Sequence, residues 1–296
     1  MTTINLIFDS LSFDFSSWQT EFSQQNANIR IYDANKDNLP EVADFLLLWH
    51  PKTRDWSTQL RLKAAFALGA GLDHLTDLTL ADDVPLLRLH DAGMKTAMCE
   101  YAQYAALRYQ RHFDAYEQTQ RQASWKPLDY RTRDSFTTGV LGLGELGQAV
   151  ANHLSDNGYK VIACSRSRKT LKGINCYTIK PELDEFLQKT DLLINLLPKN
   201  HHTLNMINQA ALAELPPQAA VVSMSRGGII NEEALLQAVD QNHIQWALLD
   251  VFDNEPLLAK HPFWQHPKSK VTPHISAQTL VKPGVKELLE RFSEFI

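Results

Sequence analysis

The chain has 296 residues, too many for one ordinary hydrophobic core, so we expect two domains. Hydrophobic residues make up 44% and charged residues 21%, the profile of a globular protein in water. A formal charge of −5 provides no basic surface for nucleic acid, and the apolar stretches are too short to span a membrane. The first five residues lack the basic region of a signal peptide, and the three cysteines lack metal-ligand spacing. We therefore expect a cytoplasmic protein with no metal site.

Short apolar runs alternate with polar or helical connections in the first hundred residues. They predict buried parallel strands at residues 4–8, 29–32, 45–49, 64–68 and 86–89, which indicates an α/β domain of flavodoxin-like size. The composition of residues 96–121 then predicts one long helix that crosses to a second domain. A polar surface loop is expected over residues 122–136.

A second α/β series follows this loop. It predicts strands at residues 137–141, 160–164, 192–197, 219–224, 246–251 and 271–272, with helices between them at residues 145–155, 181–187, 203–215 and 231–240. Six strands alternating with helices indicate a doubly wound Rossmann sheet. The last helical stretch, 282–296, is expected to return to the first domain. The predicted architecture is therefore a Rossmann domain, 101–279, inserted into a flavodoxin-like domain, 1–100 with 280–296.

The motif Gly142-Leu143-Gly144-Glu145-Leu146-Gly147 lies between a predicted strand and a predicted helix. In that setting Gly142 permits the tight turn, Gly144 lets backbone approach a pyrophosphate, and Gly147 allows close packing of helix on strand. The helix N-terminus offers free N–H groups and a favourable dipole to the anion. The motif predicts dinucleotide binding.

The end of the next predicted strand indicates which dinucleotide is bound. NAD sites usually carry an acidic residue there, which accepts hydrogen bonds from the adenosine ribose. Here the sequence reads Ser165-Arg166-Ser167-Arg168-Lys169, with no acid and three cations. Guanidinium groups can form bidentate hydrogen bonds to a 2′-phosphate, so Ser165, Arg166 and Arg168 favour NADP(H), with NAD(H) the weaker alternative. A solvated basic loop is the competing interpretation.

Three polar residues follow later strands of the same predicted sheet. They are Arg226 before Gly227-Gly228, Glu255 before Pro256, and His274 after Pro273. Each alone has an ordinary explanation as a surface or turn residue. Because the carboxyl ends of parallel strands line the ligand crevice of a doubly wound sheet, the three together suggest a catalytic set.

These segments resemble the D-2-hydroxyacid dehydrogenase family along nearly the whole chain. The resemblance rests on the glycine turn, residues 68–73, 225–228, 249–252 and 272–274, and Glu255-Pro256. It implies that the chain reduces small 2-keto acids such as glyoxylate and hydroxypyruvate. His274 would donate the proton, Glu255 would hold the imidazole, and Arg226 would bind the substrate carboxylate.

The resemblance also implies the remaining binding residues. Around the dinucleotide it places Leu197, Pro198, Thr203, Met224, Ser225 and Asp250. For the substrate it implies backbone contacts from Ala70 and Gly71 and side-chain contacts from Trp49 and Met94; for Trp49, ordinary core packing is an equal alternative. Where relatives often have Thr-Pro-Glu-Thr, this chain has Asn200-His201-His202-Thr203, so the contact near Asn200 is open.

Two other functions share this pattern. A dinucleotide-sensing corepressor on the same fold can keep the Arg–Glu–His set, although a compact acidic chain argues against it. Another dehydrogenase of the family, linked to NAD, is disfavoured by the missing ribose-binding acid. Family members commonly form homodimers, and residues 96–136 offer a contact surface.

Overall fold

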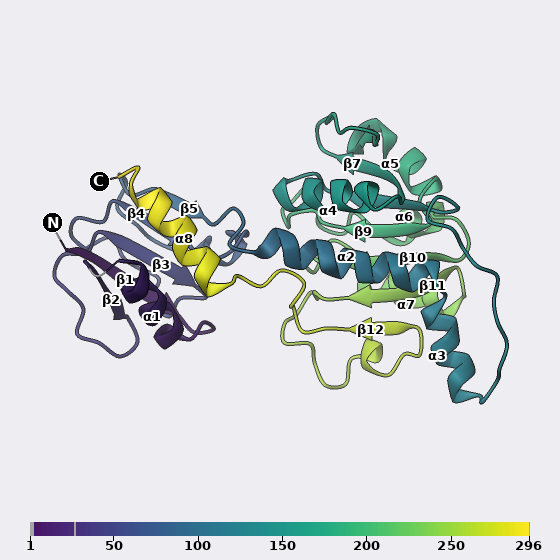
Figure 1. The fold of residues 1–296 in the computed structure, drawn as a ribbon, viewed down its shortest axis with the longest axis horizontal. Coiled ribbons are helices and arrows are strands. Elements are labelled where there is room, and N and C mark those ends of the chain that lie inside the picture. The colour runs from purple at the N-terminus through teal and green to yellow at the C-terminus, as the bar shows by residue number, and fades with distance from the viewer. Residues whose placement is uncertain (1–2, 27, 296) are drawn as a thin grey trace. The chain divides into compact units, whose positions relative to one another are not determined.

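The computed structural model describes residues 3–26 and 28–295 of the chain. The chain divides into two compact units (Figure 1). The first unit comprises Met1–Met94 and Gln278–Ile296, and the second comprises Lys95–Ala277. The C-terminal helix belongs to the first unit, so the second unit is inserted between two segments of the first.

The first unit is built on a parallel sheet of strand order β2-β1-β3-β4-β5, the flavodoxin-like order. Its strands are β1 (Ile4–Ser10), β2 (Ile29–Asp33), β3 (Phe45–Trp49), β4 (Ala64–Ala67) and β5 (Leu86–Arg88). β3 and β4 are apolar along their length because both faces of the sheet are covered. A short 3-10 helix, η1 (Asp73–Leu75), follows β4.

Two helices, α1 (Phe15–Gln25) and α8 (Val281–Phe292), pack on each other in this unit. Their aromatic side chains form the core with the sheet: Phe292 of α8 stacks on Phe45 of β3, with ring centroids 4.1 Å apart. Gly284 of α8 lies against Trp18 of α1, where a Cβ would stand 2.8 Å from the indole ring. The expected helix at residues 282–296 thus ends earlier, at Phe292.

The second unit contains a parallel sheet of order β12-β11-β10-β9-β6-β7-β8. Counted from its own first strand, the order is 3-2-1-4-5-6-7, the Rossmann arrangement with one further strand. The strands are β6 (Thr137–Leu141), β7 (Lys160–Ser165), β8 (Asn175–Thr178), β9 (Leu192–Asn195), β10 (Ala219–Ser223), β11 (Ile244–Leu249) and β12 (Ser269–Val271). The strand order reverses between β6 and β9, where such sheets bind ligands at their carboxyl ends.

Helices cover both faces of this sheet. One face packs against α2 (Met94–Gln110) and α4 (Glu145–Asp156), and the other against α5 (Ile179–Gln188), α6 (Gln209–Glu214) and α7 (Glu232–Asp240). A short 3-10 helix, η2 (Pro262–Trp264), precedes β12. The predicted Rossmann domain inside a flavodoxin-like domain is confirmed. None of the described helices is both long and apolar enough to cross a membrane.

The prediction of one helix over residues 96–121 was wrong. The helix stops at Gln110, and α3 (Phe113–Arg121) starts after His112, whose φ of 55° lies in the left-handed region. The His112 ring contacts the Asp129 carbonyl oxygen at 3.0 Å, and Arg108 pairs with Glu117 across the break at 2.6 Å. Glycine and proline, the residues that would mark such a break in the sequence, are absent from residues 96–121.

Two expectations in the Rossmann half also need correction. Of the predicted helix at 203–215, only Gln209–Glu214 is helical. Residues before it form turns and pair Ile207 with Ile230, which diverts the backbone hydrogen bonds from a helix. The polar strand β8 was missed because its sequence, Asn-Cys-Tyr-Thr, lacks an apolar run, and its edge position leaves it only partly buried.

Candidate functional site at the carboxyl edge of the Rossmann sheet

The glycine turn connects β6 to α4. The Gly142 N–H donates to the Cys164 carbonyl at 2.7 Å, and its φ of 108° requires glycine. A Cβ on Gly147 would stand 1.9 Å from the Gly142 carbonyl oxygen, so this glycine sets how closely α4 approaches the turn. Both residues are therefore explained by the turn and its packing.

Gly144 is different, because a Cβ there would meet no atom within 4 Å. It occupies the N-cap position of α4, and no side chain caps this helix end. The next residue, Glu145, is exposed and pairs with Lys95 at 3.7 Å, while Leu146 packs against the core. Open space in front of uncapped N–H groups fits a pyrophosphate that approaches the backbone.

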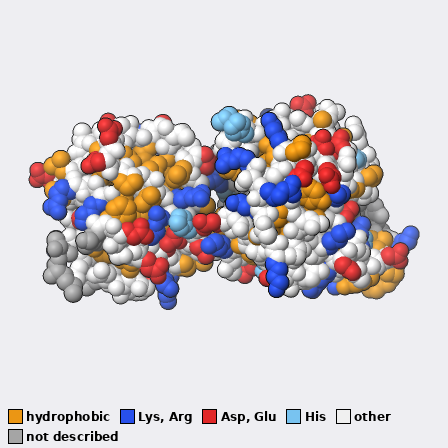
Figure 2. Space-filling model, turned by 90° about the horizontal axis from the view of Figure 1, so that it is seen from above, with side chains coloured by type: hydrophobic (Ala, Val, Ile, Leu, Met, Phe, Trp, Pro, Cys, Tyr) orange, Lys and Arg blue, Asp and Glu red, His pale blue; other side chains and the backbone are white. Residues whose placement is uncertain are grey.

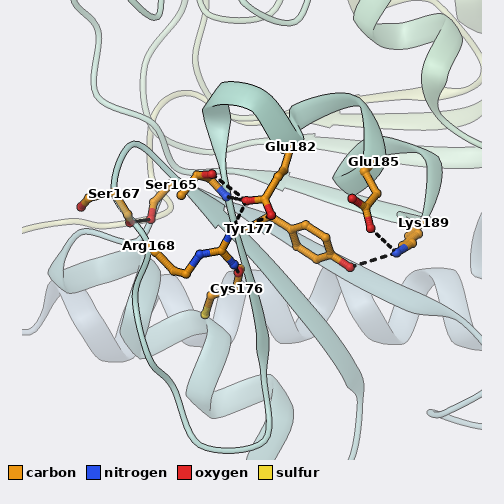
Figure 3. A network of polar contacts seen from close by, with 9 residues as sticks. Ser165, Ser167, Arg168, Cys176, Tyr177, Glu182, Glu185 and Lys189 are labelled. Atoms are coloured by element: carbon orange, nitrogen blue, oxygen red, sulfur yellow. Dashed lines mark hydrogen bonds and ion pairs between the residues drawn. The ribbon is translucent and has the colours of Figure 1, made fainter.

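Residues 165–169, here called the arginine loop, follow β7. Ser165 is buried, and its hydroxyl donates to the Ser167 carbonyl at 2.8 Å. Arg166 is exposed, and among the described residues no partner is bonded to its guanidinium. Arg168 extends to Glu182 in the first turn of α5, and its Nη2 lies 2.6 and 2.5 Å from the two carboxylate oxygens (Figure 3). The two arginines expected to act alike thus have different surroundings.

Asp250, directly after β11, holds the loop of residues 272–276, here called the His274 loop. Its fully buried carboxylate accepts hydrogen bonds from the Thr272 hydroxyl at 2.6 Å and from the Ile275 and Ser276 N–H groups at 2.8 Å. Tyr101 of α2 contacts the same Thr272 hydroxyl at 2.6 Å. Burial raises the pKa of Tyr101, which keeps this phenol protonated. The tyrosine therefore donates to Thr272, and Thr272 donates to Asp250.

His274 has a φ of 53°, a left-handed conformation that costs a non-glycine residue about 1 kcal/mol. The backbone N–H of His274 donates to the Asp250 and Thr272 carbonyls at 2.9 and 3.1 Å, which holds it there. The imidazole Nδ1 lies 2.7 Å from Glu255 Oε2. The remaining ring nitrogen, Nε2, is therefore the one free to face a ligand, since the side chain is exposed.

Glu255 is held by its own loop as well as by the histidine. The Phe252 N–H donates to Oε1 at 2.9 Å. Burial would raise the pKa of Glu255, but the hydrogen bonds from His274 and Phe252 and the charges of His274 and Arg226 outweigh it, so the pKa is lowered. The carboxylate thus stays ionised beside the imidazole.

Arg226 follows β10 in the neighbouring loop, and its Nη1 donates to the Ser225 carbonyl at 2.8 Å. The next residue must be glycine, because a Cβ on Gly227 would stand 1.9 Å from the Phe252 carbonyl oxygen. Close packing of these loops brings the Arg226 charge near enough to Glu255 to help lower its pKa. Arg226, Glu255 and His274 therefore gather at one edge of the sheet.

The other predicted dinucleotide residues lie at the ends of β9 and β10. Met224 and Leu197 are buried, whereas Pro198 is exposed. Ser225 Oγ accepts from Asn195 Nδ2 at 3.5 Å. Thr203, also buried, donates to the Pro198 carbonyl at 2.6 Å. The divergent turn before it is closed by its own bonds, since the Asn200 side chain accepts from the His202 N–H at 2.9 Å.

The predicted substrate residues Trp49, Ala70, Gly71 and Met94 belong to the first unit. Trp49 ends β3, and its ring rests on Gly69, where a Cβ would stand 2.3 Å from it. The Ala70 carbonyl accepts from Arg88 at 2.9 Å, Gly71 is partly exposed, and Met94 is buried. Trp49 thus lies beside the loop that contains Ala70 and Gly71.

Sequence reasoning missed Thr272, Tyr101 and Glu182. A threonine after a strand and a tyrosine on a helix carry no recognisable spacing, and their contact joins residues 171 positions apart. Glu182 lies beyond the point at which a ribose-binding acid is sought, and only the unpredicted strand β8 brings it back beside β7. Among residues 3–26 and 28–295, no group of three or more His, Cys, Asp or Glu side chains is arranged to hold a metal ion.

Comparison with known proteins identifies the family. Residues 104–276 match the model of the D-isomer specific 2-hydroxyacid dehydrogenase, NAD binding domain. Glyoxylate/hydroxypyruvate reductase A of Serratia proteamaculans is 40% identical over 293 residues, which cover 96% of this chain and 93% of that protein.

Solved structures agree with this assignment. A D-isomer specific 2-hydroxyacid dehydrogenase of Xanthobacter autotrophicus in complex with NADPH aligns with a TM-score of 0.93 at 30% identity, covering 99% of this chain and 95% of that one. An NADPH-dependent glyoxylate/hydroxypyruvate reductase of Sinorhizobium meliloti in complex with NADP aligns with a TM-score of 0.91, also at 30% identity, with the same coverage. The chain belongs to the D-isomer specific 2-hydroxyacid dehydrogenase family.

Proposed function

We propose that this protein uses NADPH to reduce small 2-keto acids, converting glyoxylate to glycolate and hydroxypyruvate to D-glycerate. The observation that carries the proposal is the 2.7 Å contact between His274 Nδ1 and Glu255 Oε2 at the carboxyl edge of the Rossmann sheet. The names of the relatives in Serratia and Sinorhizobium support the same substrates.

His274 is the proposed proton donor. With Nδ1 hydrogen-bonded to Glu255, Nε2 presents the proton to the keto oxygen of the substrate. The ionised Glu255 carboxylate accepts a hydrogen bond from Nδ1 and fixes the orientation of the ring. NADPH, when bound, supplies the hydride that reduces the carbonyl carbon.

Arg226 is proposed to bind the substrate carboxylate and to polarise the keto oxygen. In the first unit, the backbone of Ala70 and Gly71 would contact the same carboxylate, while Trp49 and Met94 would limit the substrate side chain. Trp49 has little freedom to turn aside, because its ring lies on Gly69 and 4.4 Å, centroid to centroid, from the ring of His74. A fixed indole favours substrates of two or three carbons.

The dinucleotide is proposed to lie along the carboxyl edge, with its pyrophosphate at Gly144 and the N-terminus of α4. Leu197, Pro198 and Thr203 would border it, with Met224, Ser225 and Asp250 near the nicotinamide. Its 2′-phosphate would contact Ser165, Arg166 and Arg168, so NADPH is preferred and NADH is used more weakly.

We further propose that the enzyme is a cytoplasmic homodimer that does not bind nucleic acid. Exposed aromatic and apolar side chains on α3 and the following segment support a contact surface there: Phe113, Trp125, Leu128 and Tyr130, with Trp125 fully exposed. Acidic and basic side chains are interspersed on the face seen in Figure 2, which gives no extended basic surface for nucleic acid. Among the described residues, Cys99, Cys164 and Cys176 form no disulfide bond, which agrees with a reducing compartment.

A panel of 2-keto acids tests this function, with oxidation of NADPH or NADH followed by absorbance. Glyoxylate and hydroxypyruvate are expected to be turned over with NADPH, and keto acids with branched or aromatic side chains far more slowly. Dinucleotide binding without turnover of any keto acid would instead indicate a sensor. Turnover only with NADH would indicate an NAD-linked dehydrogenase of the family.

A further inference from the structure

Glu182 contacts the arginine loop through Arg168, although it lies 14 positions beyond Arg168 in the sequence. It is part of the first turn of α5, next to β8, which pairs with β7 so that Ser165 lies opposite Thr178. The fold therefore places a carboxylate beside the loop that the proposed function assigns to the 2′-phosphate. A carboxylate at that place is unexpected, because its negative charge would repel the 2′-phosphate.

The Glu182 carboxylate is itself firmly held. Its Oε2 accepts from the Thr178 N–H at 2.7 Å and from the Thr178 hydroxyl at 2.6 Å. Hydrogen bonds from Arg168 and Thr178 lower the pKa of Glu182 to about 2. The side chain of Glu182 is 24% exposed, against 59% for Arg168. Glu182 is thus the fixed member of the pair.

Arg168 is held by two elements at once. Its Nη2 donates to both Glu182 oxygens, and its Nη1 donates to the Cys176 carbonyl of β8 at 2.7 Å (Figure 3). Among the described residues no acceptor is bonded to Nε, so the Nε–H and one Nη1 hydrogen stay available. The guanidinium also borders an open hollow of about 370 Å³ formed with residues 169–171 and 174–177, where solvent can reach it.

The ion pair with Glu182 limits the hydrogen bonds that Arg168 can donate to a phosphate. A free arginine offers two N–H groups in parallel to a phosphate, but here Nη2 is committed to Glu182. Arg168 therefore cannot make a two-bonded contact through Nη2 while the pair is intact. It provides a pre-oriented positive charge with single donors, whereas Arg166, without a described partner, keeps both of its bonding edges free.

We propose that Glu182 is a positioning residue for recognition of the adenosine 2′-phosphate, and that it acts by holding Arg168 and the arginine loop in place. This inference rests on the proposed use of NADPH. Holding the arginine before the ligand binds reduces the side-chain entropy lost on binding. The opposing effect is repulsion between the Glu182 carboxylate and the phosphate, which pairing with Arg168 neutralises. The positioning effect is the larger of the two.

The test compares binding of 2′,5′-ADP and 5′-AMP to the whole chain by calorimetry, because these probes differ only in the 2′-phosphate. Wild-type protein is expected to bind 2′,5′-ADP more tightly. Glu182→Ala is expected to reduce that preference about tenfold while changing 5′-AMP affinity less than twofold. Glu185→Ala is the matched control: it lies on the same helix and removes the 2.6 Å ion pair with Lys189, and it is expected to leave both affinities unchanged (Figure 3).

A double mutant shows whether Glu182 acts through Arg168. In an Arg168→Ala background, Glu182→Ala is expected to have no further effect on the preference. Thr178→Val, which removes one hydrogen bond to Glu182, should reduce the preference in the same direction by a smaller factor, and it serves if Glu182→Ala fails to fold.

Three results would overturn the inference. The first is an unchanged or increased preference for 2′,5′-ADP in Glu182→Ala, which would make the carboxylate a bystander or a competitor for Arg168. The second is a full effect of Glu182→Ala in the Arg168→Ala background. The third is equal binding of both probes by the wild-type protein; that result would also remove the NADPH proposal, whereas the first two leave it standing.

Discussion

The two polar loops at the carboxyl edge of the Rossmann sheet are positioned in different ways. The His274 loop is tied by its backbone to a fully buried carboxylate, Asp250, and to the carbonyls around it. The arginine loop is tied at its exposed end by an ion pair, Arg168 with Glu182. Buried hydrogen bonds define a geometry to a fraction of an ångström, whereas exposed ion pairs are screened by salt and contribute little stability.

This difference matches the two tasks. Proton transfer requires the donor within hydrogen-bond reach of the reacting oxygen, so His274 is held rigidly even at the cost of a left-handed backbone. Recognition of a phosphate dianion tolerates small displacements because charge attraction falls off gradually with distance. Four changes to the protein or its conditions test that contrast, and their expected effects decrease in size from His274 to the exposed ion pairs.

Replacement of His274 should have the largest effect. His274→Asn removes the proposed proton donor, and kcat for glyoxylate is expected to fall about 10²- to 10⁴-fold with dinucleotide affinity unchanged. Steady-state kinetics and fluorescence titration with NADPH measure the two quantities. His266→Asn is the control, because it also breaks a histidine–carboxylate contact, with Asp240 at 3.1 Å. Near-normal turnover by His274→Asn would show that another group donates the proton.

Arg166→Ala should change cofactor choice. Arg166 has no bonded partner among the described residues, so its removal disturbs no described contact in the protein. Losing charge-assisted bonds to the 2′-phosphate is expected to lower kcat/KM with NADPH about 10- to 100-fold and to leave NADH nearly unaffected. Ser165→Asp should shift the preference the same way by repelling the phosphate. Unchanged ratios in both variants would mean that the arginine loop does not read the 2′-phosphate.

Asp250→Asn tests the buried anchor. An amide can accept fewer of the three hydrogen bonds and must bury its own N–H groups, so the free energy of unfolding should fall by about 2 kcal/mol. Turnover should fall about tenfold, because a 1 Å displacement of His274 impairs proton transfer. Asp191→Asn is the matched control, because the Asp191 side chain also accepts a backbone hydrogen bond, from the Thr137 N–H at 2.7 Å. This substitution should lower the free energy of unfolding and leave turnover unchanged. Equal turnover in both variants would show that Asp250 does not position His274 for proton transfer.

Lowering the pH should weaken the ion pairs of Glu117 and Glu182 and so reduce the free energy of unfolding. Hydrogen bonds from Arg108 and Lys270 lower the pKa of Glu117 to about 2, as those from Arg168 and Thr178 do for Glu182. Because both pKa values are lower in the folded protein than in the unfolded chain, the stability that they provide is complete above pH 4.5 and is lost as the pH falls towards 2. Denaturant unfolding across that range measures it. Glu117→Gln should flatten the dependence; an unaltered slope would contradict the contribution of this pair.

Much of this architecture follows from local pattern. Apolar runs such as Phe45–Trp49 and the glycine turn define the strands and the dinucleotide edge, because parallel sheets bury both faces of their strands. The parts that were missed depend on long-range contacts. The left-handed His112 divides a helix without a sequence marker, and β8 is recognisable only from its pairing with β7.

The site shows the same limit. Arg226, Glu255 and His274 could be proposed because each follows a strand that ends at the same edge. Their supporting residues could not, since Tyr101 lies far from Thr272 in the sequence. Arg168 was expected to contact the 2′-phosphate in the same way as Arg166. Only the fold shows that the Arg168 guanidinium forms an ion pair with Glu182.

The most direct test is oxidation of NADPH and of NADH by glyoxylate with the wild-type protein, with kcat/KM determined for both cofactors under identical conditions. Turnover is expected with both cofactors, and kcat/KM is expected to be at least about tenfold higher with NADPH, the value of one charge-assisted contact. Absence of turnover, or equal kcat/KM with the two cofactors, would contradict the proposed NADPH-dependent reduction of 2-keto acids.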